Sequence, residues 1–185
     1  MASSGLGAIM KTKLCLLLLF ACSCFAIEGR AAVTLPDSCG KDEVRFEAKA
    51  TKNPPAPGGP AEGKAQIFFM ENENQMVEPF SYVTVRYGMD GAWVGADNGT
   101  SYFVLMVDPG VHHLCASWQS SLKTFEKNVD VTSFTAEAGK TYYFSAAVTV
   151  ESREVVTFGL SQLNDDQGKF RVKSARLSTS KPKQP

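Results

Sequence analysis

The sequence predicts an all-β fold, a β-sandwich followed by a short C-terminal helix. Three observations support this class. Short segments in which apolar and polar residues alternate recur along the 185-residue chain, as expected for strands with one buried face. Glycine, proline and Asp-Gly turn signals separate these segments at short intervals. No strand pattern is joined to another by a crossover helix pattern, which argues against a doubly wound α/β fold.

The first predicted strands lie on either side of a proline-rich loop. Residues 43–48 alternate, whereas residues 65–70 form a continuous apolar run that is typical of a buried strand. Between them, residues 53–60 contain four prolines and two glycines, so they cannot form a regular element. Residues 80–87 alternate again, and the Asp-Gly pair that follows predicts a tight hairpin into a strand over 92–96.

The middle of the chain predicts a second hairpin. Residues 101–107 are apolar on both faces, which is typical of a central strand. In the turn Asp108-Pro109-Gly110, proline presets φ and glycine supplies positive φ. We therefore expect residues 111–118 to return beside residues 101–107.

Three further strands and a helix complete the predicted domain. One strand starts near Val129 and ends near Ala138, the next covers the alternating residues 141–150, and the last covers 155–163. About eight or nine strands with short connections are the pattern of an immunoglobulin-like or prealbumin-like sandwich. We expect the domain to span residues 43–175.

The C-terminal helix is predicted from a cap and an apolar stripe. Asn164 is a favoured N-cap residue, and Phe170, Val172 and Ala175 supply the stripe. Gly168 lowers the helix propensity of this segment. The basic and polar residues 176–185 are expected to be a disordered tail.

The N-terminus predicts export. Lys11 and Lys13 precede a short apolar run over 14–21, and this pattern is typical of a secretory signal peptide. The run is shorter than the ~20 apolar residues that span a bilayer. We expect residues 1–26 to be a signal peptide and residues 27–42 an extended lead-in, with the mature protein in the periplasm or cell envelope.

Two kinds of processing remain open. Cleavage after Ala26 or Ala31 fits plain secretion. The run that ends at Cys22 resembles a bacterial lipobox, and Cys24 follows a weaker version, so both are candidate lipidation sites. Lipidation at Cys22 would leave Cys24 as an odd thiol in an oxidising compartment, so cysteine parity favours plain secretion. Contact with a membrane is expected only through such a lipid anchor.

The two remaining cysteines, Cys39 and Cys115, are expected to form a disulfide, which is the usual state in an exported protein. On the strand 111–118, Leu114 and Trp118 belong to one face, and Cys115 belongs to the other. If the first face meets the core, the bridge fastens the lead-in to the outside of the sheet.

The charge balance argues against a nucleic-acid partner. Cleavage of residues 1–26 removes two of the 19 basic residues and none of the 19 acidic ones, so the mature chain carries about two excess negative charges. The oligomeric state is not predicted by any of these patterns.

Five runs, taken together, resemble a bacterial family of exported domains known as "domain of unknown function 2846". The resemblance covers about residues 62–175, and the runs are Lys64–Phe69, Gly99–Phe103, Val107–His112, Ala138–Tyr143 and Leu163–Lys169. It implies a small secreted or lipid-anchored envelope β-sandwich with no established activity, so no functional residues are carried over. The N-terminal segment with Cys39 and the proline-rich loop depart from the pattern of many members.

Catalytic chemistry has little support in the sequence. His112 and His113 are the only histidines, and neighbours on a strand point to opposite faces, so both cannot readily bind one metal ion. No G-x-S-x-G elbow or paired carboxylates stand out. We expect a non-catalytic protein without metal or cofactor. The alternative is a metal-dependent or hydrolytic enzyme that uses His112 or His113.

The expected role is structural or is the binding of an envelope protein or glycan. Trp93 is the best candidate for an exposed binding surface, because its neighbours Ala92 and Val94 take the opposite face of their strand. A further alternative is pairing of an edge strand with a partner.

Overall fold

The computed structural model describes residues 36–41, 44–52, 54–73, 84–119, 128–150 and 156–183. They belong to one structural unit, Val33–Pro185. Their strands are β1 (Phe46–Thr51), β2 (Ala65–Glu73), β3 (Thr84–Met89), β4 (Ala92–Asn98), β5 (Ser101–Val107), β6 (Gly110–Gln119), β7 (Val129–Ala136), β8 (Thr141–Val150), β9 (Val156–Leu163) and β10 (Arg176–Pro182). The helix α1 (Asp165–Ser174) precedes β10. The predicted signal peptide and the candidate lipidation sites Cys22 and Cys24 lie outside the described residues.

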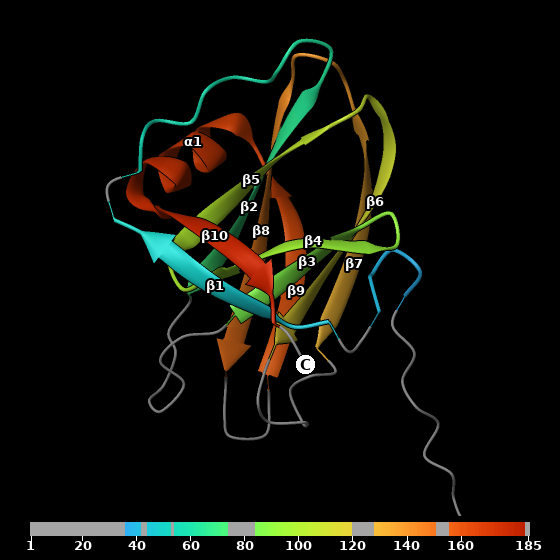
Figure 1. The fold of residues 1–185 in the computed structure, drawn as a ribbon, viewed down its shortest axis with the longest axis vertical. Coiled ribbons are helices and arrows are strands. Elements are labelled where there is room, and N and C mark those ends of the chain that lie inside the picture. Colours follow the sequence, from blue (N-terminus) through green and yellow to red (C-terminus); the bar gives the residue numbers. More distant parts are fainter. Residues whose placement is uncertain are drawn as a thin grey trace, which may run out of the picture. The chain divides into compact units, whose positions relative to one another are not determined.

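The strands form two sheets that pack face to face (Figure 1). The six-stranded sheet has the order β1-β10-β5-β2-β8-β9, and the four-stranded sheet has the order β4-β3-β6-β7. The predicted all-β sandwich with a short C-terminal helix is therefore confirmed. No helix among the described residues is long and apolar enough to cross a membrane.

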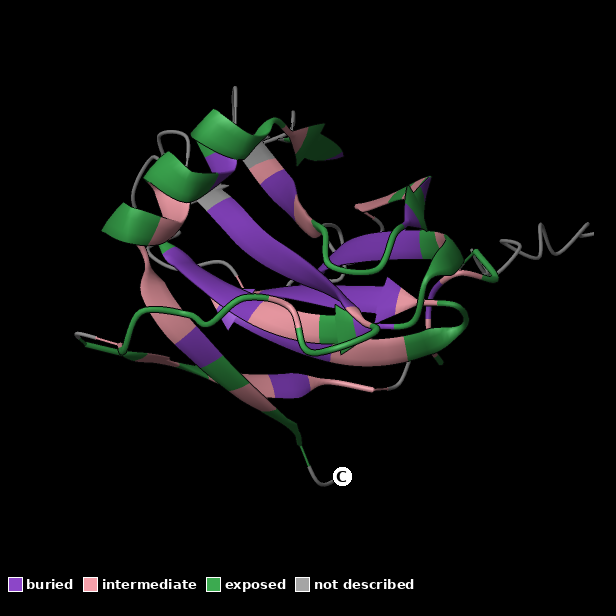
Figure 2. Cartoon of the chain, turned by 90° about the horizontal axis from the view of Figure 1, so that it is seen from above, coloured by how far each residue is buried: buried purple, intermediate pink, exposed green. Residues whose placement is uncertain are grey.

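The core between the sheets consists mainly of aromatic and aliphatic side chains on alternate strand positions. The Phe69 ring lies at its centre, 4.8 Å from the ring of Tyr87, 5.0 Å from that of Phe103 and 6.0 Å from that of Phe144. Leu114 and its neighbours two positions apart on β6 complete the core from the other sheet. Figure 2 shows buried residues concentrated in the strands and exposed residues on the outer side of α1.

The Asp90-Gly91 turn joins β3 to β4 as predicted. Asp90 has φ 51° and Gly91 has φ 86°, and two central residues with positive φ are typical of a tight hairpin turn whose twist matches its strands. The hairpin prediction is wrong at Asp108-Pro109-Gly110, because β5 and β6 belong to different sheets. This turn carries the chain across the core, since turn chemistry specifies a reversal of direction and does not specify which strand the chain will pair with.

The predicted disordered tail is wrong for Arg176–Pro182, which forms β10. This strand pairs with β1 through six antiparallel positions and with β5 in parallel at Arg176 and Leu177. Ser178 donates a hydrogen bond to the Ala96 carbonyl at 3.1 Å, and the Ser180 hydroxyl accepts one from the Ala96 N–H at 2.9 Å. These serines join the two sheets, so their polarity serves a contact inside the fold.

The other side of the sandwich is joined by Asp130 on β7. Its carboxylate accepts a hydrogen bond from the Leu160 N–H on β9 at 2.7 Å. The edge strands β7 and β9 are thereby linked across the two sheets.

The helix begins at Asn164, as predicted. Its side chain accepts a hydrogen bond from the Gln167 N–H, and the Gln167 side chain accepts one from the Asn164 N–H, which is a capping box. The expected stripe is wrong at Phe170, which is 74% exposed, whereas Val172 packs inward. Gly168 is the buried residue of the helix. The helix backbone packs so closely on the Tyr143 ring there that a Cβ would lie 2.1 Å from Cγ of Tyr143.

The lead-in forms a strap, residues 36–41 and 44–45, over the outer face of the four-stranded sheet. It contains a turn at Pro36–Cys39 rather than being extended throughout. The predicted disulfide between Cys39 and Cys115 is present, with a Cα–Cα distance of 5.2 Å across 76 positions of sequence. Leu114 faces the core, so Cys115 lies on the outer face, as the alternation predicted.

Candidate binding cleft

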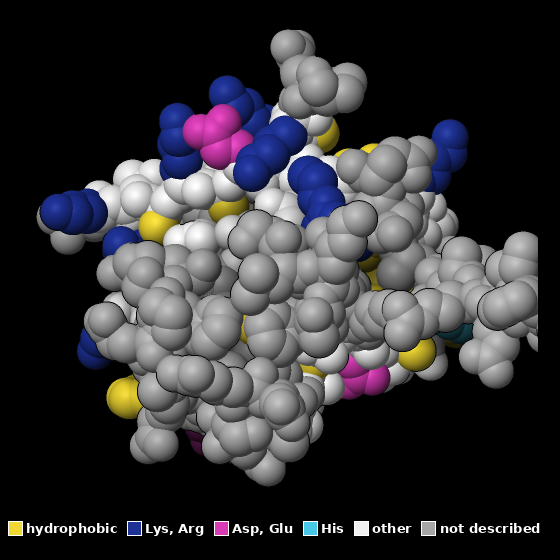
Figure 3. Space-filling view, turned by 90° about the horizontal axis from the view of Figure 1, so that it is seen from below, with side chains coloured by type: hydrophobic (Ala, Val, Ile, Leu, Met, Phe, Trp, Pro, Cys, Tyr) yellow, Lys and Arg dark blue, Asp and Glu magenta, His cyan; other side chains and the backbone are white. Residues whose placement is uncertain are grey.

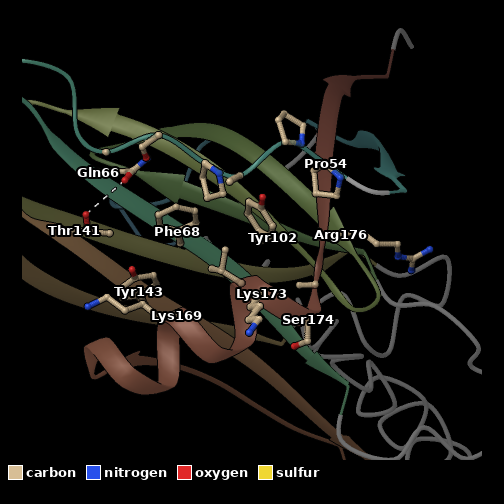
Figure 4. Close-up of a pocket in the computed structure, with 17 residues that line it drawn as sticks. Pro54, Gln66, Phe68, Tyr102, Thr141, Tyr143, Lys169, Lys173, Ser174 and Arg176 are labelled. Carbon is tan, nitrogen blue, oxygen red and sulfur yellow. Dashed lines mark hydrogen bonds between the residues drawn. The ribbon is translucent and has the colours of Figure 1, made fainter.

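A cleft of about 840 Å³ lies on the outer face of the six-stranded sheet. Its walls are the proline-rich loop over 54–59 and the helix α1, and its floor is formed by β2, β5 and β8 (Figure 4). Ligand sites in proteins typically have volumes of about 300–1,000 Å³, so the cleft is large enough for a small ligand or a segment of a polymer.

The floor is aromatic because of strand register. Phe68 on β2 lies opposite Tyr143 on β8, and Tyr102 on β5 lies opposite Met70, two positions further along β2. Since alternate residues share a face, these side chains all point away from the core between the sheets. The Phe68 ring centroid is 5.3 Å from that of Tyr143 and 5.6 Å from that of Tyr102, so the three rings pack as one layer.

The proline-rich wall is tied to the floor by Gln66. Its side-chain amide donates a hydrogen bond to the Gly58 carbonyl at 2.9 Å. The Thr141 hydroxyl donates to the same side chain at 3.5 Å, as the dashed line in Figure 4 shows. The loop therefore has a fixed attachment to β2, although its sequence cannot form a regular element.

The helical wall is held by two contacts with β8. The absence of a side chain at Gly168 allows the helix backbone to lie directly on the Tyr143 ring. Arg171 donates a hydrogen bond to the Ser145 hydroxyl at 3.1 Å. The two contacts fix the distance of α1 from the floor and therefore the width of the cleft.

Two phenol hydroxyls are available in the cleft. Tyr102 is 1% exposed and Tyr143 is 6% exposed, and neither hydroxyl has a hydrogen-bond partner among the described residues. Burial raises the pKa of Tyr102 above its usual value, and burial together with the nearby Asp165 carboxylate raises the pKa of Tyr143. Both hydroxyls therefore stay protonated at neutral pH and can donate as well as accept a hydrogen bond.

The described lining of the cleft carries basic side chains and no acidic ones. Lys169 is paired with Asp165 at 3.0 Å, whereas Lys173 has no ion-pair partner among the described residues. On the face drawn in Figure 3, basic side chains gather along one margin around an acidic side chain. Elsewhere, on β1 and β10, Lys49 and Lys181 both pair with Glu47. Lys173 therefore differs from Lys49 and Lys181, because no acidic side chain among the described residues pairs with it.

His112 is engaged by two turns. Its Nδ1 lies 2.7 Å from the Asp90 carboxylate, and its Nε2 donates to the Asp108 carbonyl at 2.8 Å. Burial alone would lower the pKa of His112, but the Asp108 carbonyl and the Asp90 carboxylate outweigh it and raise that pKa. His113 is exposed on the other face of β6, and its backbone N–H donates to Asp90 at 2.8 Å. Both nitrogens of the His112 ring are therefore occupied within the fold.

Trp93 is half-buried, which corrects the expectation of an exposed surface. Its indole N–H donates to the Lys41 carbonyl of the strap at 2.7 Å, and the Arg86 guanidinium lies 4.2 Å above its ring. The backbone of Gly40 also packs on the ring, where a Cβ would lie 2.3 Å from Cδ1. The period-two pattern placed this side chain on the outer face correctly, but it did not reveal that the strap covers that face.

A buried carboxyl group lies between the sheets at the end of β4. Asp97 is fully buried and accepts a hydrogen bond from the Tyr87 hydroxyl at 3.0 Å. Burial raises the pKa of Asp97 well above its usual value, although hydrogen bonds from Tyr87 and from the Glu71 backbone act in the opposite direction. In the part of the chain that the structure describes, no group of three or more His, Cys, Asp or Glu residues could hold a metal ion.

The chain matches no family model, no curated protein and no solved structure. The cleft was not anticipated from the sequence. A usable signal was present, because Phe68, Tyr102 and Tyr143 each occupy the non-core phase of a buried strand. Three large aromatic residues in that phase indicate that something covers the outer face of the sheet.

Proposed function

We propose that this chain is an exported, non-catalytic domain of the cell envelope that binds a ligand in the cleft between the proline-rich loop and α1. The observation that carries the proposal is the pair of tyrosines, Tyr102 and Tyr143, whose rings form the floor and whose hydroxyls open into the cleft without hydrogen-bond partners among the described residues. Each hydroxyl opens into the cleft, where it can donate a hydrogen bond to a ligand and accept one from it.

The geometry around His112 supports binding over catalysis. A general base or metal ligand needs a ring nitrogen with a free lone pair, and both nitrogens of His112 face acceptors from Asp90 and Asp108. The enzyme alternative that relies on His112 therefore needs the β3–β4 and β5–β6 turns to separate first. The exposed His113 offers no second group aligned with it in the described contacts.

The disulfide supports the export part of the proposal. Disulfides persist in oxidising compartments and are rare in the cytosol, and the Cys39–Cys115 bond joins the strap to β6. We also propose kinship with the "domain of unknown function 2846" family, with its envelope location. Intact-mass measurement of the native protein tests export, because retention of residues 1–21 would contradict it and an added acyl mass would indicate lipidation.

The binding proposal is tested by blocking the cleft. A Val172→Trp variant adds bulk at the helical wall, and a matched Val131→Trp variant adds the same bulk on the exposed side of β7. Both proteins are used as bait in an envelope fraction that contains proteins and glycans. We expect wild type and Val131→Trp to recover the same component and Val172→Trp to lose it. Equal recovery by all three proteins, each shown to be folded, would overturn the cleft as the binding site.

A further inference from the structure

We propose that the ligand of the cleft is an acidic saccharide, a chain of sugar rings that carry carboxylate groups. This inference rests on the proposed function and adds the chemistry of the ligand. It combines three features of the cleft: surplus positive charge, hydroxyls that can donate and accept, and floor residues whose strands are already paired.

The charge of the lining favours an anion. Lys169, Lys173 and Arg176 line the cleft, and no acidic residue does so in the described part of the chain. The Asp165 carboxylate compensates Lys169, so Lys173 supplies the surplus, whereas the Arg176 side chain extends away from the floor in Figure 4. Figure 4 shows Lys173 on the helical wall beside Ser174. A carboxylate on the ligand would complete an ion pair at Lys173 without displacing an existing partner.

The walls and floor disfavour an extended peptide. A peptide that binds by strand addition needs unpaired backbone N–H and C=O groups at a sheet edge. At the cleft, β2 is paired with both β5 and β8, Tyr143 of β8 also pairs with β9, and Tyr102 of β5 also pairs with β10. Pro54, Pro55 and Pro57 of the facing wall have no N–H to donate.

The hydroxyls of the floor match sugar hydroxyls. Tyr102 and Tyr143 each present a group that both donates and accepts, as a sugar hydroxyl also does. The proline rings of the wall and the edges of the aromatic rings provide apolar surface for the C–H faces of sugar rings. A saccharide with carboxylates therefore satisfies the phenols and the lysine together.

The experiment compares two ligands of the same shape. A tetramer of galacturonic acid and its fully methyl-esterified form are titrated into the full, disulfide-bonded exported protein, with calorimetry for affinity and NMR for location. We expect the acid to bind and to shift resonances of Tyr102, Tyr143 and Lys173. The ester should bind about tenfold more weakly, because the charge-assisted contact is lost. Added salt should weaken binding of the acid and leave that of the ester unchanged.

Matched variants assign the contacts. Lys173→Glu should weaken binding of the acid at least about tenfold, whereas Lys183→Glu makes the same charge change on an exposed residue outside the cleft and should leave binding unchanged. Tyr102→Phe removes only a hydroxyl and should weaken both ligands by about two- to tenfold. Tyr142→Phe removes a hydroxyl that does not line this cleft, and it should leave both affinities unchanged.

The outcomes separate this inference from the proposed function. Equal binding of acid and ester, weakened by Tyr102→Phe, would overturn the acidic character and leave the cleft as a saccharide site. Shifts at the cleft with tetraglutamate and with neither saccharide would overturn the saccharide class and leave the binding function standing. No shift with any of the three probes would overturn the inference, and the bait experiment with Val172→Trp would then decide the proposed function by itself.

Discussion

His112 is a histidine whose charge stabilises the fold. Its ring joins the β3–β4 turn, through Asp90, to the β5–β6 turn, through Asp108. A group whose pKa is higher in the folded state binds more protons there than in the unfolded chain. The stabilisation is fully present below the unfolded pKa of about 6.5. It is lost as the pH rises through the raised pKa of the folded protein.

We expect this loss to appear as a fall in the free energy of unfolding above about pH 6.5. The pH-dependent part should be about 1 kcal/mol, because Asp90 is partly exposed and solvent screens the pair. Urea unfolding of wild type and His112→Ala across this range measures it. His113→Ala is the matched control and should keep the wild-type profile. A wild-type pH dependence that persists in His112→Ala would contradict the assignment.

Asp97 has a linkage of the same sign as His112, at lower pH. Its pKa is raised by burial, so the folded state holds a proton that the unfolded chain loses above about pH 3.8. The free energy of unfolding should therefore fall as the pH rises from there, by about 1.4 kcal/mol for each unit of pKa difference. Asp97→Asn cannot ionise and should abolish this slope.

The same unfolding titrations test Asp97, with Asp166→Asn as the control. Asp166 is exposed in the first turn of α1, so its substitution should leave the slope of wild type in place. An Asp97→Asn protein with an unchanged slope would show that another carboxyl group is responsible.

At the scale of the element, the packing of α1 depends on Gly168, although glycine has a low helix propensity. We expect Gly168→Ala to lower the free energy of unfolding by about 1–2 kcal/mol, because the added Cβ meets the Tyr143 ring. This fall is the net change, so the contact with Tyr143 should cost more than the gain of about 1 kcal/mol in helix propensity. Urea unfolding provides the measurement. Phe170→Ala, on the exposed side, should change stability by less than about 0.5 kcal/mol.

The strap depends on its disulfide. Replacing both cysteines, Cys39→Ala with Cys115→Ala, should lower the free energy of unfolding by about 2–4 kcal/mol and leave the sandwich folded. Trp93 should then become more exposed, because the strap supplies its Lys41 partner. Chemical unfolding and a red shift of tryptophan emission test the two effects, with reduction of wild type as a parallel measurement. Unchanged emission would contradict a covering role for the strap.

The elements that the sequence predicted well are those with a local signal. The run over 65–70, the alternation over 141–150 and the cap at Asn164 each carry their information within a few residues. The sequence of β10 carries little local signal for a strand, because Ser178 and Ser180 are inward-facing polar residues that form hydrogen bonds with the Ala96 backbone. A disordered tail and a strand that is held by its hydroxyl groups have the same pattern in sequence.

At the scale of the whole molecule, β10 holds the two sheets together. We expect a chain truncated after Ala175 to lose cooperative unfolding, since β1 loses the strand with which it pairs and the Ala96 contacts are removed. Circular dichroism during urea unfolding tests this. In the full-length control, Lys181→Ala with Lys183→Ala removes the same lysines and should change stability by less than about 0.5 kcal/mol. A cooperative transition in the truncated chain would contradict the role of β10.

The cleft illustrates why a site can be hidden from sequence reasoning. Its floor joins Phe68, Tyr102 and Tyr143 from strands that are brought together by parallel and antiparallel pairing. Strand alternation assigns each residue to a face, but the order of strands in a sheet depends on contacts far apart in the chain. The prediction of an exposed surface at Trp93 used only its neighbours on the strand. The residue is covered by a segment about fifty residues away in sequence, which those neighbours do not reveal.

The pairing of β1 with β10 also bears on how the protein is made. Phe46 lies opposite Pro182, so the first described strand gains its neighbour only after more than a hundred further residues have been synthesised. A ribosome-bound chain that has not yet released β10 can assemble the four-stranded sheet and the β8–β9 hairpin, but it leaves one margin of the sandwich incomplete. The sandwich is therefore completed only after β10 has left the ribosome, and until then β1 has no neighbour in its sheet.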